Sequence, residues 1–382
     1  MIAPQFRPLV GGYERAAERL AEELVSLGHE VTVIADCRDK CWPRMETTNG
    51  VTVRRLWCIY RTGLHLLTAL LSHAAFLLLN GRRYDVFHIH QYGYHAAVTV
   101  VIGRLLRRPI ILKITNTGAQ GIEQALVDEK KTSRLLALLH RKVDACIATT
   151  VEAQEEAARF GIPRERIRVI PNGIASDFFK PCDRQGKAEI KKRLGLGSSL
   201  TVLYCGRLSS AKNAEGLIEA WNAIHCNVSN AELVLIGDGP MRKILESRVA
   251  AHGLTMSIRL AGLQPEVLSW YQAADVFVLP SHHEGLSNSL LEAMSCGLPV
   301  VSTRVSGSTS IFAERDVGEL VDVGDIPGLA TALLRLLTDA TRRGTCGFRA
   351  REYARVRFSI QAVAEETLGL YAQLVEGGSR YS

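Results

Sequence analysis

The sequence predicts an α/β protein made of two doubly wound domains in tandem. Short apolar segments alternate with amphipathic helices along the chain, a pattern typical of parallel strands joined by crossover helices. The pattern stops at the turn signal Pro171-Asn172-Gly173 and then begins again. With 382 residues the chain is also too long for one ordinary core. We therefore expect one domain over residues 1–175 and a second over residues 176–357.

The first half contains a helix and five strand-like segments rich in branched apolar residues. The helix covers residues 14–27 and ends at Gly28. The strands are predicted at residues 30–34, 51–53, 85–90, 110–112 and 145–148. This order is typical of parallel strands with crossover helices.

The second half repeats the arrangement and ends in one more helix. Strands are predicted at residues 201–204, 232–236, 275–279 and 299–301. Residues 358–376 form a terminal segment whose apolar positions have helical spacing. Ligands of such folds sit at the carboxyl ends of parallel strands and at domain interfaces, so we expect the ligand in a central cleft between the two domains.

Composition indicates a folded protein without a metal centre or a membrane span. Apolar residues make up 47% of the chain and charged residues 22%. The nine cysteines form no CxxC pair, and Cys37 and Cys41 lack the partners that would complete four zinc ligands. Polar residues interrupt the most apolar stretch, residues 64–79, and the first residues lack the apolar core of a signal peptide. We expect a reduced, cytoplasmic protein.

The net charge of +7 is concentrated in the first half of the chain. Residues 1–175 contain 24 Lys and Arg against 17 Asp and Glu, whereas residues 176–382 contain 22 of each class. A basic first half suggests an anionic partner, either a membrane surface or an acidic acceptor. Nucleic acid is a weaker candidate, because no basic run is interleaved with aromatic residues. Ordinary surface charge explains the excess equally well.

Two acids in residues 281–301 form the strongest candidate site. Glu284 follows a predicted strand, Gly285 breaks it, and Ser287 or Asn288 can cap a helix that contains Glu292. A helical spacing separates the two acids by about 12 Å and turns their side chains about 80° apart, so they cannot chelate one atom. They could hold opposite ends of an extended ligand, with a diphosphate at the helix N-terminus between them. The alternative is two solvated surface acids.

Three further loops would reach the same cleft. Gly11-Gly12 precedes the first helix, where bare backbone could approach a phosphate, although a plain turn explains the pair as well. Arg207 and Lys212 follow a strand and supply the two cations that a diphosphate needs. Gly237-Asp238-Gly239 lacks the third glycine of a dinucleotide fingerprint, and no Walker lysine or GxSxG motif occurs.

Six segments together resemble the retaining glycosyltransferases of family four, which use nucleotide-sugar donors and have the two-domain GT-B fold. They are GGYERAAERLAEEL, PNGI, YCGRLSSAKN, LVLIGDGPM, HHEGLSNSLLEAMSCGLPVVST and GELVDVGD. The match runs from about Val10 to Leu374, and six motifs in order are specific where one would not be.

The resemblance implies roles for individual residues. Arg207 and Lys212 would bind the donor diphosphate, Glu292 would hold the ribose, and Glu284 would contact the sugar. Gly285, Leu286 and Ser287 would offer backbone N–H groups to the phosphate, with Gly12 closing on it from the other domain. The terminal helix would pack back on the N-terminal domain.

The chain departs from the family pattern in three places. It starts almost inside the first loop, so the first strand is expected to be missing, and we expect that the natural N-terminus lies upstream of Met1. Lys113 and Thr115 stand where many relatives have a histidine near the sugar. His90 remains as a candidate on the acceptor side, and a structural histidine explains it equally well. Ser310 replaces the acid of a Gly-Gly-x-x-Glu segment.

The resemblance therefore implies a hexosyltransferase of cell-envelope, exopolysaccharide or related glycan biosynthesis. The donor would be a nucleotide sugar, and the acceptor a glycan, a lipid-linked sugar or a small molecule. We expect no cofactor and no metal, because no DxD-type triplet is present, and we expect peripheral contact with the inner face of a membrane through the basic half. A catalytically silent sugar-nucleotide-binding protein, an epimerase and a phosphorylase stay open as alternatives.

Overall fold

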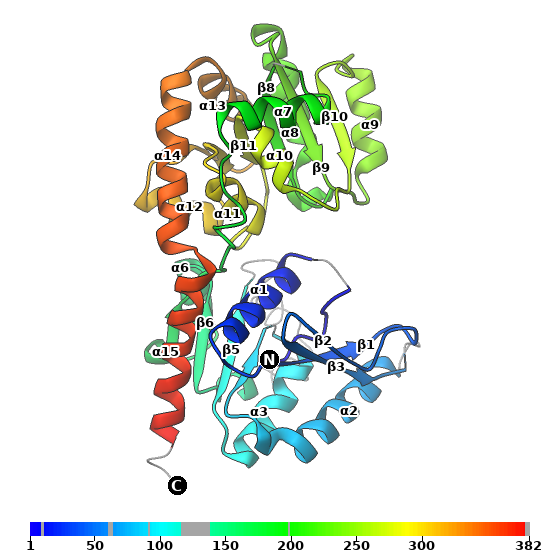
Figure 1. The fold of residues 1–382 in the computed structure, drawn as a ribbon, viewed down its shortest axis with the longest axis vertical. Helices are drawn as coiled ribbons and strands as arrows, with labels where there is room; N and C mark the ends of the chain where they lie inside the picture. The colour runs from blue at the N-terminus through cyan, green and yellow to red at the C-terminus, as the bar shows by residue number, and fades with distance from the viewer. Residues whose placement is uncertain (9–10, 60–63, 91, 116–137, 198, 379–382) are drawn as a thin grey trace. The chain divides into compact units, whose positions relative to one another are not determined.

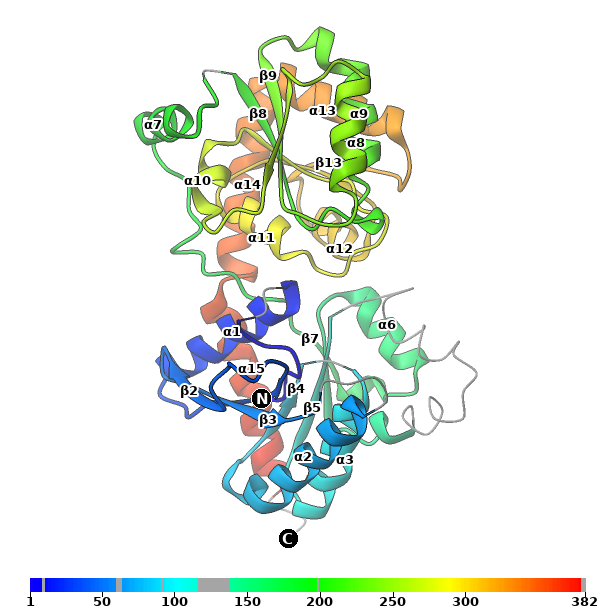
Figure 2. The same ribbon diagram turned by 90° about the vertical axis from the view of Figure 1, so that its right-hand side faces the viewer.

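A computed structural model of the chain describes residues 1–8, 11–59, 64–90, 92–115, 138–197 and 199–378. It divides into two compact units, Met1–Gly173 with Ile360–Ser382 and Ile174–Ser359. Figures 1 and 2 show both units as parallel sheets covered by helices, which confirms the predicted α/β class. The boundaries expected from sequence, after residues 175 and 357, lie close to these divisions.

The sheet of the first unit consists of two ladders. The strands are β1(Thr32–Cys37), β2(Met45–Thr48), β3(Val51–Trp57), β4(Phe87–Ile89), β5(Ile110–Ile114), β6(Ala145–Ala148) and β7(Ile167–Val169). One ladder has the order β1-β3-β2 and the other β4-β5-β6-β7. All pairings are parallel except that of β2 with β3, which the sequence analysis missed.

Residues 1–4 connect the two ladders. Ile2 forms parallel bridges to Ile34 in β1 and to Ile89 in β4. Its N–H donates to the His88 carbonyl at 2.8 Å, and its own carbonyl accepts from the His90 N–H at 3.0 Å. The sequence analysis expected the first strand to be missing, but this backbone lies between β1 and β4 where that strand would be. The backbone N–H and C=O groups of the two neighbouring strands therefore find hydrogen-bond partners here.

Helices cover both faces of this sheet. In the described part of this unit they are α1(Gly12–Ser26), α2(His65–Asn80), α3(Tyr94–Leu106), α6(Val151–Arg159) and α15(Ile360–Gly378). Alternate residues of β5 and β6 point to opposite faces: Ile110 and Leu112 join the core beneath α2, α3 and α6, whereas Ile111 packs against α15. The terminal helix α15 thus belongs to the first unit, where the Tyr371 hydroxyl lies 2.6 Å from His88 Nδ1.

The second unit has one parallel sheet of six strands in the order β10-β9-β8-β11-β12-β13. The strands are β8(Leu200–Cys205), β9(Ala231–Ile236), β10(Ile258–Gly262), β11(Val276–Leu279), β12(Val300–Thr303) and β13(Gly318–Val321). One face is covered by α8(Ala214–Ile224), α9(Arg242–Ala251) and α13(Ile326–Thr338). The other face is covered by α7(Arg184–Leu194), α10(Leu268–Ala273), α11(Asn288–Ser295), α12(Ser306–Glu314) and α14(Ala340–Arg357). Such double winding brings the loops after the central strands to one edge.

Candidate functional site

The predicted donor residues follow two neighbouring strands of the second unit. Arg207 and Lys212 come after β8, whereas Glu284, Gly285, Leu286 and Ser287 come after β11. Since β8 and β11 pair in parallel, their carboxyl ends emerge at the same edge of the sheet. A hydrogen bond of 2.8 Å from the His282 N–H to the Ala211 carbonyl joins the two loops.

Lys212 and Glu284 form an ion pair across these loops. Lys212 ends the short 3-10 helix Ser210–Lys212, and its Nζ donates to Glu284 Oε2. The side chains are 24% and 17% exposed, so both remain open to a ligand. Two residues that the sequence assigned to one ligand therefore bind each other in the protein alone.

Arg207 stands at the exposed end of the same edge. Its side chain is exposed and forms an ion pair with none of the acids that the structure describes. The backbone beneath it is fixed, because the Tyr204 hydroxyl donates to the Arg207 carbonyl at 3.0 Å. An exposed guanidinium on a fixed backbone is well suited to bind an anion.

Gly237 allows the loops after β8 and β9 to pack closely, and this accounts for the glycine without a bound phosphate. Its φ is +135°, and a Cβ there would overlap the Gly206 carbonyl oxygen. Leu208 N–H donates to the Asp238 carbonyl at 3.0 Å, so the loops after β8 and β9 are tied together. This packing explains the Gly-Asp-Gly segment without any dinucleotide.

The helix α11 begins at Asn288, so Glu284 lies in the preceding loop and Glu292 within the helix. Ser287 occupies the N-cap position, but its side chain makes no capping hydrogen bond and lies 3.0 Å from the Ser289 hydroxyl. The predicted N-cap position of Ser287 is confirmed, but its side chain does not form the capping hydrogen bond. The sequence analysis also assumed helical spacing from Glu284 to Glu292. This is wrong for residues 284–287, which form a loop before α11.

Glu292 is almost fully buried. The residue is 3% exposed, and its carboxylate accepts a hydrogen bond of 2.9 Å from the Tyr271 hydroxyl on α10. Burial, reinforced by Cys205 and Glu292, raises the pKa of Tyr271 well above its usual value, so this phenol stays protonated and donates. The Tyr271 hydroxyl therefore already orients the Glu292 carboxylate, and a ribose hydroxyl, as the family resemblance implies, would be a further hydrogen-bond donor to it.

The segment that departs from the family pattern supports the loop after β11. Gly307, in the first turn of α12, donates its N–H to the Gly285 carbonyl at 3.1 Å. A Cβ at Gly307 would lie 2.5 Å from that carbonyl oxygen, so a larger residue would displace the loop. Ser310 lies further along the same helix.

Gly12 is the exposed first residue of α1 in the first unit. The carboxylate of Glu14 folds back over this helix end and would overlap a Cβ at Gly11. Burial raises the pKa of Glu14. The N-terminus of α1 is thus already faced by an acid of the chain, an interaction that the sequence analysis missed.

The predicted acceptor residues lie at the ends of β4 and β5. His90 is 2% and Lys113 3% exposed, whereas Thr115 is half-buried, and Asn116–Gly118 fall outside the described residues. The rings of His88 and His90 stack with centroids 4.2 Å apart.

Burial is the main cause of the pKa shifts of His88, His90 and Lys113. It lowers the pKa of both histidines well below the ordinary value, and it lowers the pKa of Lys113 to about 8. Lys113 forms an ion pair with none of the acids that the structure describes, so its charge is held in the unit without a counter-charge.

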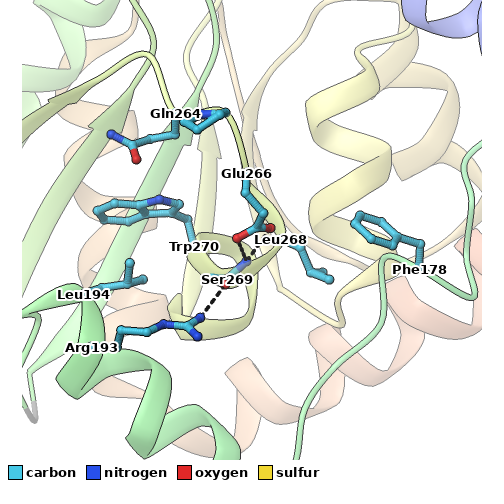
Figure 3. Close-up of a pocket in the computed structure, with 9 residues that line it drawn as sticks. Phe178, Arg193, Leu194, Gln264, Glu266, Leu268, Ser269 and Trp270 are labelled. Carbon is cyan, nitrogen blue, oxygen red and sulfur yellow. Dashed lines mark hydrogen bonds between the residues drawn. The ribbon is translucent and has the colours of Figure 1, made fainter.

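A pocket of about 510 Å³ lies elsewhere in the second unit, beside α7 and α10. Figure 3 shows its two charged side chains both engaged with Ser269: Arg193 donates to the Ser269 hydroxyl at 2.8 Å, and Glu266 accepts from the Ser269 N–H. It contains none of the predicted site residues. The residues predicted to bind a diphosphate instead follow β8 and β11.

Metal-ligating side chains do not gather anywhere in the described part of the chain in groups of three or more. Within that same part, no helix is both long and apolar enough to cross a bilayer.

Comparison with known proteins decides the family. A model described as "Glycosyl transferase 4-like domain" matches residues 11–173, and one described as "Glycosyl transferases group 1" matches residues 199–339. The chain belongs to the group 1 glycosyltransferases. The two models together cover most of both units of this transferase.

Relatives and solved structures agree along the full length. The transferase is 29% identical to an uncharacterized glycosyltransferase of Methanocaldococcus jannaschii over 98% of each chain. It is 27% identical to a GDP-mannose-dependent phosphatidylinositol monomannoside mannosyltransferase of Mycolicibacterium smegmatis over 93% of each. The crystal structure of Anabaena HepE with UDP superimposes with a TM-score of 0.80 at 19% identity, covering 97% of this chain and 98% of that one. The fold of the transferase is GT-B, as these neighbours show.

Two supporting residues escaped the sequence analysis. Tyr271 is one of two adjacent aromatic residues in the short helix α10, and nothing in its position in the sequence indicates that it contacts Glu292. Gly307 could have been noticed from the sequence, because a glycine within a helix can indicate close packing against another backbone segment.

We predict that Lys113→Met makes the first unit more stable at pH 7. The unfolded chain holds Lys113 at its ordinary pKa of 10.5, and the folded unit at about 8. Between these values the unfolded state binds more protons, so the stability of the wild type rises with pH. The variant should gain up to about 3 kcal/mol at pH 7, and its advantage should shrink from pH 8 to 10.5. Chemical denaturation across this range measures it; an advantage that stays constant with pH would contradict the burial of a charged lysine.

Proposed function

We propose that this glycosyltransferase moves a hexosyl unit from a nucleoside diphosphate sugar to a hydroxyl acceptor, with retention of configuration and without a metal ion. The observation that carries the proposal is the Lys212–Glu284 ion pair at the edge where β8 and β11 end. A cation and an acid that contact each other in the free protein can separate onto the phosphate and the sugar of one donor.

The donor would exchange this ion pair for two new contacts. A diphosphate competes for Lys212 more strongly than one carboxylate, because it offers several charged oxygens. Glu284 would then be released to accept hydrogen bonds from sugar hydroxyls. Arg207 would add a second cation, and the backbone of residues 285–287 would face the phosphate at the start of α11.

The transfer itself depends on the leaving group. The bond from the anomeric carbon to the phosphate oxygen breaks, and its electron pair remains on the diphosphate, whose growing charge Arg207 and Lys212 stabilise. Retention requires the acceptor oxygen to arrive on the face that the diphosphate leaves. The departing phosphate oxygen is then the nearest base for the hydroxyl proton.

Acceptors of three kinds are consistent with the relatives. Their names include a phosphatidylinositol mannoside mannosyltransferase, an N-acetyl-alpha-D-glucosaminyl L-malate synthase of Bacillus anthracis and a lipopolysaccharide core glycosyltransferase of Rhizobium meliloti. For this chain we propose a glycan, lipid-linked or small-molecule acceptor in glycan biosynthesis. The basic first half supports contact of a cytoplasmic enzyme with the inner face of a membrane.

A donor panel tests the proposal. The protein is incubated with UDP-, GDP- and ADP-sugars in the presence of a chelator, and release of the nucleotide diphosphate is followed. We expect slow hydrolysis of one donor class, faster release with an acceptor, and no loss of activity on chelation. Binding without release would favour a silent sugar-nucleotide-binding protein, an altered sugar without release would favour an epimerase, and phosphate-dependent release would favour a phosphorylase.

We predict that Lys212→Met weakens donor binding roughly tenfold to hundredfold, because a charged hydrogen bond to the diphosphate is lost. Isothermal titration calorimetry with the preferred donor measures this. Lys243→Met is the matched control, since Lys243 is an exposed lysine on α9 of the same unit. Equal affinities of the wild type and Lys212→Met would rule out the proposed diphosphate contact.

A further inference from the structure

The helix α2 presents an apolar face outward. None of its sixteen residues is Asp, Glu, Lys or Arg, and its exposed leucines recur at helical spacing. Leu67 is 55%, Leu71 61% and Leu79 82% exposed, and Leu64 and Leu78 are about half exposed. Ala69, His73 and Leu77 on the opposite side are buried. A surface helix normally turns polar residues outward, so this stripe requires an explanation.

The neighbouring helix α3 extends the apolar surface. Figures 1 and 2 show α2 and α3 side by side in the first unit, and the buried His73 of α2 lies 2.8 Å from the Thr99 hydroxyl of α3. Val101 and Leu105 are 53% and 70% exposed, one helical turn apart. We call the exposed apolar residues of α2 and α3 the α2–α3 face.

Arginines border this face where the two helices end. Arg82 and Arg83 follow Gly81, the C-cap of α2. Arg104 lies in the last turn of α3, Arg107 is its C-cap, and Arg108 comes next. The Arg108 guanidinium donates to the Arg82 carbonyl at 2.7 Å, which holds the two helix ends together. Neither α2 nor α3 contains an aspartate or glutamate. Two of these arginines are neutralised: Arg104 pairs with Asp144 at 2.9 Å, and Arg108 lies 3.8 Å from Asp85. The exposed Arg82, Arg83 and Arg107 remain, so the border is basic beside an apolar surface without Asp, Glu, Lys or Arg.

We infer that the α2–α3 face docks on a bilayer that contains anionic lipids. Leucines can enter the boundary between headgroups and acyl chains, while arginines reach the lipid phosphates and keep their own charge in water. A second copy of the chain fits less well, because its α2 and α3 carry no acid for Arg82, Arg83 and Arg107, and Asp85 at the border already lies beside Arg108. This inference rests on the membrane contact proposed above and names the residues that would make it. Its test measures lipid binding and not sugar transfer, so the two can fail separately.

Vesicle flotation tests this inference with the full chain. We expect binding to vesicles of equal parts phosphatidylglycerol and phosphatidylcholine, and little binding to phosphatidylcholine alone. Raised salt should weaken binding, because the arginine contribution is screened. Leu67→Gln with Leu71→Gln should lower the partition coefficient on the order of tenfold, since two exposed apolar side chains are lost from the interface. Arg82→Gln with Arg83→Gln should abolish the preference for phosphatidylglycerol.

Matched controls lie in the second unit. Met256→Gln removes an apolar side chain that is 95% exposed, and Arg184→Gln removes an exposed arginine; both should bind vesicles like the wild type. Thermal melting of each variant separates lost docking from lost folding. The inference is overturned if vesicles do not bind, if the leucine variant binds as the wild type does, or if that variant instead dissociates a dimer seen in sedimentation.

Discussion

The candidate site depends on one interaction, the ion pair between Lys212 and Glu284. It exists because β8 and β11 are adjacent parallel strands whose following loops are joined by the His282–Ala211 hydrogen bond. Gly307 supports the second loop from α12, and the packing at Gly237 holds the loop that carries Arg207. The charges are therefore positioned by backbone contacts before any ligand arrives, which limits the reorganisation that donor binding requires.

Much of the fold could be predicted from the sequence, because buried parallel strands are continuous apolar runs. The runs at β5, β6, β8 and β9 were found with bounds close to those observed. The strands that were missed are polar or lie toward the sheet edges: β2, with the sequence METT, is an exposed antiparallel edge, and β13 begins at a glycine. Residues 1–4 were missed as sheet backbone, since a bridge this short has no periodicity to detect.

The site was predicted less completely, because residue type indicates chemistry but not contacts. Lys212 and Glu284 were both assigned to the donor, yet no sequence signal shows that they bind each other. The sequence also does not show which polar side chains are buried. His90 and Lys113 were interpreted as acceptor residues, but they are buried within the first unit. The charge asymmetry between the halves was visible, whereas its concentration at the ends of α2 and α3 depends on helix packing.

The exchange of the ion pair is tested most directly by calorimetry on Glu284→Gln with the preferred donor and with its nucleotide diphosphate alone. If Lys212 must leave Glu284 to bind the diphosphate, the variant should bind the nucleotide about twofold to fivefold more tightly than the wild type. It should also lose most of the extra affinity that the sugar supplies. Weaker binding of the nucleotide, with the sugar contribution intact, would contradict this account.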